Sequence, residues 1–228
     1  MKSIEWCDET WNPVWGCLND CPYCYARKIA KRFGKTEDER NFIPTWREAG
    51  FNKRFKKSTK RVFVNSMSDV LYWEEEWWLK VLEKITQYPN IDFIFLTKAD
   101  SYPDLPYPPN VILGYTITRN GQAKNKVWAK DSRRLLNIEP ISQPMGLYEA
   151  LSCVPFYDWL IIGAETGNRK GKPAFHLSWI QAPIAVAVEH KVPVFLKDNI
   201  RVFLKDNIRT KYYLDIFRQE YPKSWRNP

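Results

Sequence analysis

The sequence predicts an α/β protein folded as a complete or partial parallel β/α barrel. Two observations favour this fold. Short apolar runs typical of strands alternate with helical stretches along most of the 228 residues. These runs are almost continuously apolar, as expected of parallel strands that are covered on both faces. A flat doubly wound sheet is the alternative fold, but no glycine-rich phosphate-binding turn follows the first strand. We therefore expect a single barrel domain over residues 1–228.

The expected elements follow one another in the order that a barrel requires. One strand precedes residue 15. Six further strands are expected at 61–66, 91–97, 111–116, 135–138, 159–162 and 192–196. Between them we expect helices at 74–86, 123–133, 146–151 and 178–190. In the first of these helices, an amphipathic pattern is formed by the apolar residues Trp77, Trp78, Val81, Leu82 and Ile85.

Three cysteines lie close together in the loop at 15–26. Cys17, Cys21 and Cys24 have the spacing Cys-x3-Cys-x2-Cys, just before a helical segment. Three thiolates on one loop can hold three irons of a 4Fe-4S cluster and leave the fourth iron open to another ligand. Reductive cleavage of S-adenosylmethionine requires an open iron of this kind. The spacing therefore predicts radical chemistry.

A structural zinc site is the alternative use of these thiols. Zinc sites usually have four ligands in two separated pairs, and only Cys21 and Cys24 form such a pair. Cys7 would have to supply the fourth ligand. Disulfides are not expected, because the chain has five cysteines and no signal peptide opens it. Cys153 lies in an apolar stretch and is expected to be a buried core thiol.

The net charge of +9 is concentrated in two short segments. Four basic residues lie at 27–32 and six more at 53–61, interleaved with Phe33, Phe51 and Phe55. Such patches suit a nucleic acid backbone with stacked bases, so we expect a nucleic acid or nucleotide substrate. A solvated basic surface, or the docking of an acidic protein, would use the same residues.

Polar side chains end the expected strands. In a parallel barrel these strand ends meet at one rim, which is where active sites lie. The residues are Ser66, Asp69, Thr97, Lys98, Thr116, Thr118, Glu139, Glu165 and Lys197. Lys98 and Lys197 could neutralise an anionic substrate, and Glu139 and Glu165 lie in the two most site-like segments.

Several blocks of sequence carry a resemblance to a known family. They are Thr10–Cys17, Cys21–Ala26, Val62–Asp69, Phe95–Lys98, Asn137–Pro140, Gly163–Gly167 and Val192–Lys197. In this order they resemble the three-cysteine-motif proteins of phages and bacterial mobile elements, a family largely of unknown function that is related to radical S-adenosylmethionine enzymes. The resemblance covers nearly the whole chain. It implies a barrel, a cluster and bound S-adenosylmethionine, but no known substrate.

The resemblance also implies roles for single residues. Cys17, Cys21 and Cys24 would bind the cluster, and Tyr23 would lie against the adenine. Where such enzymes carry a glycine-rich turn for the methionine amino group, this chain has Ser66 and Asp69 in the segment 65–69.

Other residues would serve the ribose and the substrate. Thr116 or Glu139 would meet the ribose hydroxyls. Lys98, Glu165 and Lys197 would act at the substrate, from which a 5′-deoxyadenosyl radical takes a hydrogen atom. An electron donor protein would reduce the cluster.

The C-terminal part contains a repeat without a turn. The octapeptide at 194–201 is followed at once by an identical copy at 202–209. Only one copy can occupy the sheet, and we expect the first, because Val192 and Pro193 lead directly into it. Lys197 and Lys205 are then alternative occupants of one rim position. No run approaches the roughly 18 apolar residues of a membrane span, and we expect a cytoplasmic protein of a bacterial or phage-infected cell.

Overall fold

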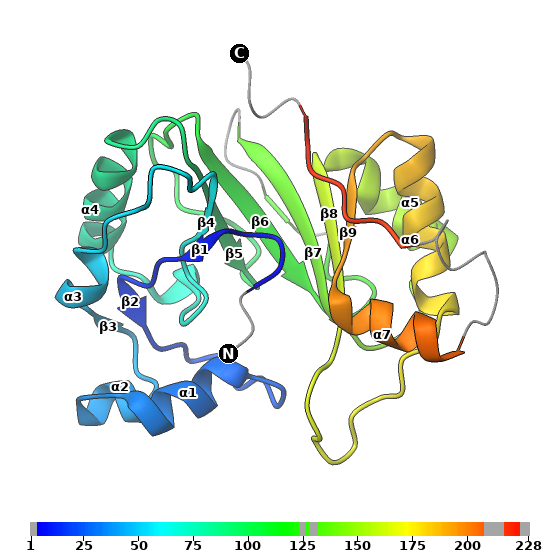
Figure 1. Ribbon diagram of the computed structural model, residues 1–228, viewed down its shortest axis with the longest axis horizontal. Coiled ribbons are helices and arrows are strands. Elements are labelled where there is room, and N and C mark those ends of the chain that lie inside the picture. Colours follow the sequence, from blue (N-terminus) through cyan, green and yellow to red (C-terminus); the bar gives the residue numbers. More distant parts are fainter. Residues whose placement is uncertain (1–3, 124–125, 128–131, 208–216, 224–228) are drawn as a thin grey trace. The chain divides into compact units, whose positions relative to one another are not determined.

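The computed structural model describes residues 4–123, 126–127, 132–207 and 217–223. Its strands are β1 (Glu9–Thr10), β2 (Val14–Trp15), β3 (Thr45–Trp46), β4 (Arg61–Phe63), β5 (Asp92–Thr97), β6 (Val111–Ile117), β7 (Arg133–Ile141), β8 (Trp159–Ala164) and β9 (Val194–Leu196). Its helices are α1 (Tyr25–Phe33), α2 (Glu37–Asn41), α3 (Glu48–Phe51), α4 (Glu75–Thr86), α5 (Leu147–Cys153), α6 (Ser178–Glu189) and α7 (Asp198–Asn207), with short 3-10 turns at Val70–Tyr72 and Val154–Phe156. Figure 1 shows these elements along the chain.

Seven strands hydrogen-bond in the order β1-β4-β5-β6-β7-β8-β9, which is their order in the sequence. The pairs β1–β4, β4–β5, β7–β8 and β8–β9 are parallel. The expected mixed α/β fold with a parallel sheet is confirmed, and the strand order is consistent with a partial β/α barrel. A second, two-stranded sheet joins β2 and β3 in antiparallel fashion.

The chain forms two compact units, which are described separately below. Unit 1 comprises Met1–Leu113 with Trp128–Ser132, and unit 2 comprises Gly114–Val127 with Arg133–Pro228. A single domain over residues 1–228 stays a prediction.

The core of unit 1 is aromatic. Strand β5 is buried along nearly its whole length, as the continuous apolar run predicts. Helix α4 buries four of the five expected apolar residues, Trp78, Val81, Leu82 and Ile85, whereas Trp77 is half-buried. The Trp78 ring lies 5.1 Å from the rings of both Trp73 and Phe95. Helix α4 therefore covers β5 through one aromatic cluster.

The core of unit 2 is aliphatic along its strands. All six residues of β8 are buried, and β7 is buried from Leu135 to Ile138. Figure 1 shows α5 and α6 next to each other beside these strands, and the two helices are in contact. Helix α6 buries Ile180, Val186 and Ala187 despite an internal proline at Pro183.

Two expectations about single segments had opposite outcomes. The helix expected at 123–133 is wrong for the described residues, because Ala123 is in a turn and Arg133 already belongs to β7. Strand β7 begins two residues earlier than expected, where the Arg134 N–H bonds to Asp158 at 2.7 Å. Residues 124–125 and 128–131 of that segment lie outside the described residues. The placement of the first octapeptide copy in the sheet is confirmed, since Val194–Leu196 forms β9.

The second copy of the octapeptide has a different structure. Residues 202–207 lie in helix α7 and not in a loop. Val-Phe-Leu thus forms strand β9 at 194–196 and lies in helix α7 at 202–204, and only the first copy hydrogen-bonds to β8. No described helix is long and apolar enough to cross a membrane.

Candidate functional site

The cysteine loop is anchored at its start by Gly16. This residue has a φ of +107°, and a Cβ added to it would lie 2.1 Å from the Ile43 carbonyl oxygen. The Gly16 N–H donates to the Met67 carbonyl at 3.0 Å, and the Cys17 N–H donates to the Phe42 carbonyl at 2.9 Å. Only glycine fits this position. The loop therefore begins from a fixed point between two other segments of unit 1.

The three thiols of the loop are free and half-buried. The Cys17 sulfur accepts the Asn19 N–H at 3.4 Å. Cys24 caps the N-terminus of α1, where its sulfur accepts the Arg27 N–H at 3.4 Å. Backbone N–H donors and a helix N-terminus both favour negative charge on sulfur.

Cys17 is held as a neutral thiol in the absence of a cation. Burial, together with the nearby Asp69, Cys21 and Cys24, raises the pKa of its thiol to about 12. The electrostatic effects of Cys21 and Cys24 place the three sulfurs in one neighbourhood. A bound cation would reverse the balance, because a coordinating thiol loses its proton to the metal.

The donor set of the loop fits an iron–sulfur cluster, although the side chains are not gathered around a common point. Three free cysteines within eight residues of chain supply the thiolates that a cluster with one open iron needs. Among the described residues, no three His, Cys, Asp or Glu side chains form a group ready to hold a metal ion. Binding would therefore require the three thiols to turn toward one another.

Asp69 connects the cysteine loop with the end of β5. Its carboxylate is buried and accepts four hydrogen bonds. The donors are Asn19 Nδ2 at 3.1 Å, Thr97 Oγ1 at 2.5 Å and the N–H groups of Leu71 and Lys98 at 3.1 Å. The Tyr72 hydroxyl holds the other end of the Asn19 side chain at 2.9 Å. Asp69 therefore holds the loop in place, and its expected contact with a cofactor ammonium stays a prediction.

The other predicted residues of unit 1 lie around the same loop. The Lys98 ammonium is 5.9 Å from the centre of the Tyr23 ring, so these two residues are neighbours. Ser66 is bonded to Asn12 at 3.1 Å through its hydroxyl, and its carbonyl accepts the Tyr25 hydroxyl at 2.8 Å. Ser66 and Asp69 thus hydrogen-bond to residues that flank or lie within the cysteine loop, and Lys98 is next to Tyr23.

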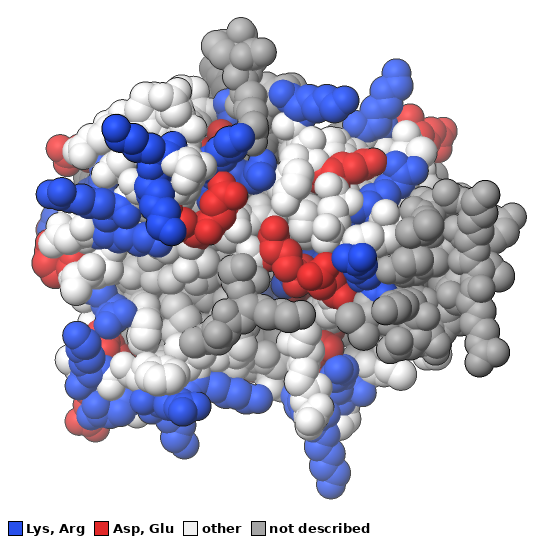
Figure 2. Space-filling model, viewed as in Figure 1, with Lys and Arg blue, Asp and Glu red and all other residues white. Residues whose placement is uncertain are grey.

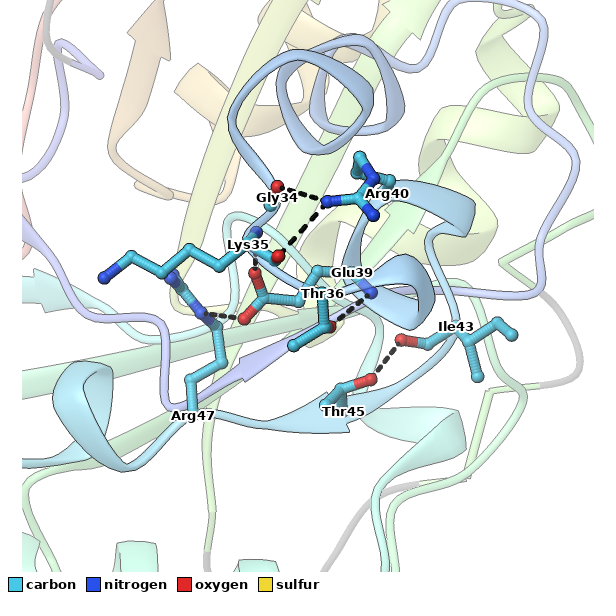
Figure 3. A network of polar contacts seen from close by, with 8 residues as sticks. All are labelled: Gly34, Lys35, Thr36, Glu39, Arg40, Ile43, Thr45 and Arg47. Carbon is cyan, nitrogen blue, oxygen red and sulfur yellow. Dashed lines mark hydrogen bonds and ion pairs between the residues drawn. The ribbon is translucent and has the colours of Figure 1, made fainter.

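Residues 34–47 form a network of polar contacts, called the clamp below (Figure 3). The sequence analysis did not identify it. Thr36 caps α2 by accepting the Glu39 N–H at 3.2 Å, and the buried Glu39 accepts the Lys35 N–H at 2.6 Å. Glu39 also pairs with Arg47 at 2.7 Å. Burial alone would raise the pKa of Glu39, but these hydrogen bonds hold it below its usual value. The sequence pattern that could have indicated this network is the Thr-x-x-Glu capping box at 36–39.

The clamp reaches the cysteine loop through two contacts. The Arg47 guanidinium lies 3.9 Å from the centre of the Trp15 ring, and Trp15 directly precedes Gly16. Phe42, which ends α2 with a φ of 62°, supplies the carbonyl that binds the Cys17 N–H. The clamp therefore fixes the residues that enter the loop.

In unit 2, Glu139 and Lys197 form an ion pair across strand β8. Glu139 is on β7 and Lys197 directly follows β9, so β8 lies between them. A Cβ on Gly163 of β8 would lie 2.9 Å from both Glu139 Oε1 and Lys197 Cδ. The pair can therefore lie over β8 only because residue 163 has no side chain. In the sequence, a glycine within an otherwise apolar strand was the feature that could have indicated this ion pair.

Thr116 and Asn137 lie beside this ion pair on neighbouring strands. Asn137 Nδ2 donates to Thr116 Oγ1 at 3.3 Å, and both residues are buried. The Oδ1 atom of Asn137 has no hydrogen-bond partner in the part of the chain that the structure describes. Sequence reasoning singled out Thr116 and Glu139 but not the role of Asn137 between them.

Glu165 lies at the end of β8 and is bound by Arg169. The Arg169 Nε and Nη2 atoms donate to its two carboxylate oxygens at 2.6 and 2.8 Å. Asn199, from the first octapeptide copy, bonds to the backbone of Ala164 through both ends of its amide. Unit 2 therefore contains Thr116, Glu139, Glu165 and Lys197, the predicted residues that are absent from unit 1. One rim that joins all the predicted residues stays a prediction.

Comparison with protein families gave one match. The model of a family described as a protein of unknown function (DUF5131) matches residues 1–211. Comparisons with curated proteins and with solved structures gave no match.

Proposed function

We propose, for a chain that belongs to the DUF5131 family of proteins of unknown function, an enzyme of the radical S-adenosylmethionine type. Cys17, Cys21 and Cys24 would bind a 4Fe-4S cluster. The observation that carries the proposal is the set of three free thiols on one anchored loop, two of which accept backbone N–H groups. Thiolate ligands of clusters are commonly stabilised in this way.

The finer fold and the residue roles belong to the same proposal. The seven strands would form part of a β/α barrel whose carboxyl ends meet at the site. Bound S-adenosylmethionine, reduced through the cluster, would supply the 5′-deoxyadenosyl radical. Cofactor contacts are proposed for Tyr23, Ser66, Asp69, Thr116 and Glu139, and substrate contacts for Lys98, Glu165 and Lys197.

The protein's own residues would prepare this chemistry in two ways. Asp69 and Asn19 would keep the loop against the end of β5, since their hydrogen bonds join these two segments. The N-terminus of α1 would stabilise the Cys24 thiolate through its aligned backbone dipoles. An electron donor protein would deliver the electron to the cluster.

A nucleic acid or nucleotide substrate is supported by the surface of unit 1. Figure 2 shows Lys and Arg side chains gathered over α1 and α2, at the lower left of the view. Lys28, Lys31, Arg32, Lys35 and Arg40 are exposed there. The exposed Phe33 ring lies under the Arg32 guanidinium, 5.0 Å from it. Phosphate groups would bind such a helix face, and the cysteine loop immediately precedes it.

Anaerobic purification tests the cluster. The visible absorption spectrum and assays of iron, sulfide and zinc are compared between the wild type and the variants Cys17→Ala, Cys21→Ala and Cys24→Ala. Cys7→Ala and Cys153→Ala are the matched controls, because both residues are buried cysteines outside the loop. We expect a brown protein with about four irons per chain. The loop variants should lose this iron and the two controls should keep it.

A colourless protein with one zinc would contradict the proposal. If Cys7→Ala also lost that zinc, the chain would be the alternative, a non-catalytic nucleic-acid-binding module with a four-thiolate site. For the substrate, binding of single-stranded DNA is measured against salt concentration with Lys28→Glu and Lys31→Glu. Lys191→Glu, an exposed lysine of unit 2, is the control. An equal effect of all three variants would exclude α1 as the nucleic acid surface.

A further inference from the structure

Asn137 carries a buried acceptor that the described chain leaves unused. The residue is 3% exposed, and its Oδ1 atom has no hydrogen-bond partner among the described residues. Almost all buried polar atoms in folded proteins are hydrogen-bonded, because an unpaired one loses its contact with water without compensation. The position therefore costs stability, and a bound molecule that donates a hydrogen bond would remove this cost.

The neighbours of Asn137 share one face of the unit 2 strands. Asn137 of β7 and Phe195 of β9 both pair with Ile161 of β8, and parallel partners point to the same face. Glu139 and Lys197 follow two residues later on this face and lie over Gly163. The face thus has an apolar part formed by Ile161 and Phe195, with the amide and the ion pair beside it.

The charges on this face determine which kind of hydrogen-bond donor can bind to Asn137 Oδ1. Glu139 and Lys197 compensate each other, and their side chains are only 25% and 16% exposed. Thr116 and Asn137 are neutral. An ammonium group placed against a buried neutral amide would lose its hydration without gaining a counter-charge, whereas a hydroxyl or an aromatic amine would lose little. The acceptor is therefore suited to a neutral donor.

We propose that Asn137 Oδ1 accepts a hydrogen bond from a neutral hydroxyl or ring amine of a nucleoside bound on this face. A nucleoside carries both kinds of donor, in its ribose hydroxyls and in its base. Because Ile161 and Phe195 are fully buried, it would reach Asn137 from the side of the partly exposed ion pair. The inference rests on the proposed function for the source of the nucleoside, which is either the adenosyl group of the cofactor or the substrate. Asn137 would then distinguish ligands by the donor that they present.

Binding of adenosine and of S-adenosylmethionine to the full chain tests the inference. Dissociation constants are measured by calorimetry for the wild type, Asn137→Leu and Thr116→Val. Analogues that lack one donor each identify the group that is bound: 2′-deoxyadenosine, 3′-deoxyadenosine and purine riboside. Thymidine and cytidine represent a substrate nucleoside. We expect Asn137→Leu to weaken binding about tenfold or more.

Two further results are expected if Asn137 makes this bond. One analogue should bind the wild type about tenfold more weakly than adenosine, and this difference should disappear in Asn137→Leu. The urea midpoint of Asn137→Leu should not fall, since the variant removes an unpaired acceptor. Asn65→Leu is the matched control, because Asn65 is equally buried and both ends of its amide are bonded. Its midpoint should fall clearly.

The inference is overturned by any of three outcomes. In the first, the wild type binds none of the nucleosides. In the second, Asn137→Leu binds them within twofold of the wild type. In the third, Asn137→Leu loses as much stability as Asn65→Leu. The last result would show that Asn137 has a structural role or bonds only to a buried water. These binding measurements do not require the iron–sulfur cluster. A colourless protein that still binds nucleosides would therefore contradict the proposed radical reaction and support the inference about Asn137.

Discussion

Two buried asparagines, one in each unit, show how differently the two units use polar groups. Asn65 follows β4 in unit 1 and is 2% exposed, and Asn137 in β7 of unit 2 is 3% exposed. The Asn65 amide donates to the carbonyls of Leu96 and Ser68 and accepts the Leu96 N–H. With the residues that the structure describes, the Asn137 amide makes one hydrogen bond, to Thr116. The first side chain is fully used by the fold, whereas the second keeps an unused acceptor.

The same contrast extends to the charged groups around them. In unit 1, the Asp69 carboxylate accepts four hydrogen bonds and ties the cysteine loop to β5. In unit 2, Glu139 pairs with one lysine over a glycine. Buried polar groups that are fully bonded give rigidity, and those that are not are characteristic of binding sites. Asp69 therefore fixes a loop, whereas Asn137 keeps an acceptor that the described residues do not use.

The largest effect is expected for Asn65→Leu. The substitution leaves both the N–H and the carbonyl of Leu96 without their partner in a buried place. Stability should fall by about 3–5 kcal/mol, measured by urea unfolding. Asn137→Leu is the comparison and should not lower the stability, since it removes an unpaired acceptor. Equal losses in the two variants would remove the distinction between the two asparagines.

Gly163→Ala should give the next largest effect. The new methyl group would lie 2.9 Å from Glu139 Oε1 and Lys197 Cδ, so the ion pair must move. We expect a loss of about 2–3 kcal/mol from overpacking. Gly146→Ala is the control, since nothing lies within 4 Å of an added Cβ there.

A second experiment tests whether Gly163→Ala loses stability because it crowds the ion pair or because it disturbs strand β8. In the background Glu139→Ala with Lys197→Ala, Gly163→Ala should cost less than about 1 kcal/mol, because the crowded atoms are gone. An unchanged cost in this background would mean that the glycine serves the strand and not the ion pair.

Much of the fold could be predicted from the sequence, because its signals are local. The apolar runs at 91–97 and 159–162 contain nearly all residues of β5 and β8. The helix at 74–86 followed from the spacing of Trp78, Val81, Leu82 and Ile85, which all face the core. The helix expected at 123–133 failed because β7 extends back to Arg133, and Arg134 in this extension exchanges hydrogen bonds with Asp158, which is distant in the sequence.

The candidate site was less predictable, because its parts meet only in space. Asp69 was singled out as a polar residue after a strand, but its bond to Asn19 joins residues 50 positions apart. Gly163 and Glu139 are similarly connected only through the ion pair over β8. The unused acceptor of Asn137 has no signal in the sequence, since Asn65 is the same residue type at an equally apolar strand end. Only their hydrogen-bond partners distinguish Asn65 from Asn137.

The repeated octapeptide offers a matched test of the ion pair. Lys197 and Lys205 follow the same three residues, Val-Phe-Leu, in the two copies. Lys197 is paired with Glu139, and residue 205 lies in α7. Lys197→Met should cost about 1–2 kcal/mol more than Lys205→Met, because Glu139 loses its partner in a partly buried place. If Lys205→Met cost as much, the second copy would be able to replace the first in the sheet.

The smallest effect concerns a carboxylate of unit 1 and depends on pH. Burial alone would raise the pKa of Glu9, but hydrogen bonds from Lys53, Thr59 and the backbone of Lys56 lower it to about 2. A carboxyl whose folded pKa is lowered stabilises the fold above its usual value near 4.5, and this contribution is lost as the pH falls toward 2.

Glu9→Gln should therefore be about 1–2 kcal/mol less stable than the wild type at pH 6, and the difference should vanish near pH 2. Urea unfolding at several pH values measures it, with Glu83→Gln on the exposed face of α4 as the control. A constant difference at all pH values would mean that Glu9 acts through packing. A vanishing difference would instead show that the carboxylates of unit 1 hold its segments together through charge, the use that distinguishes them from the unused acceptor of unit 2.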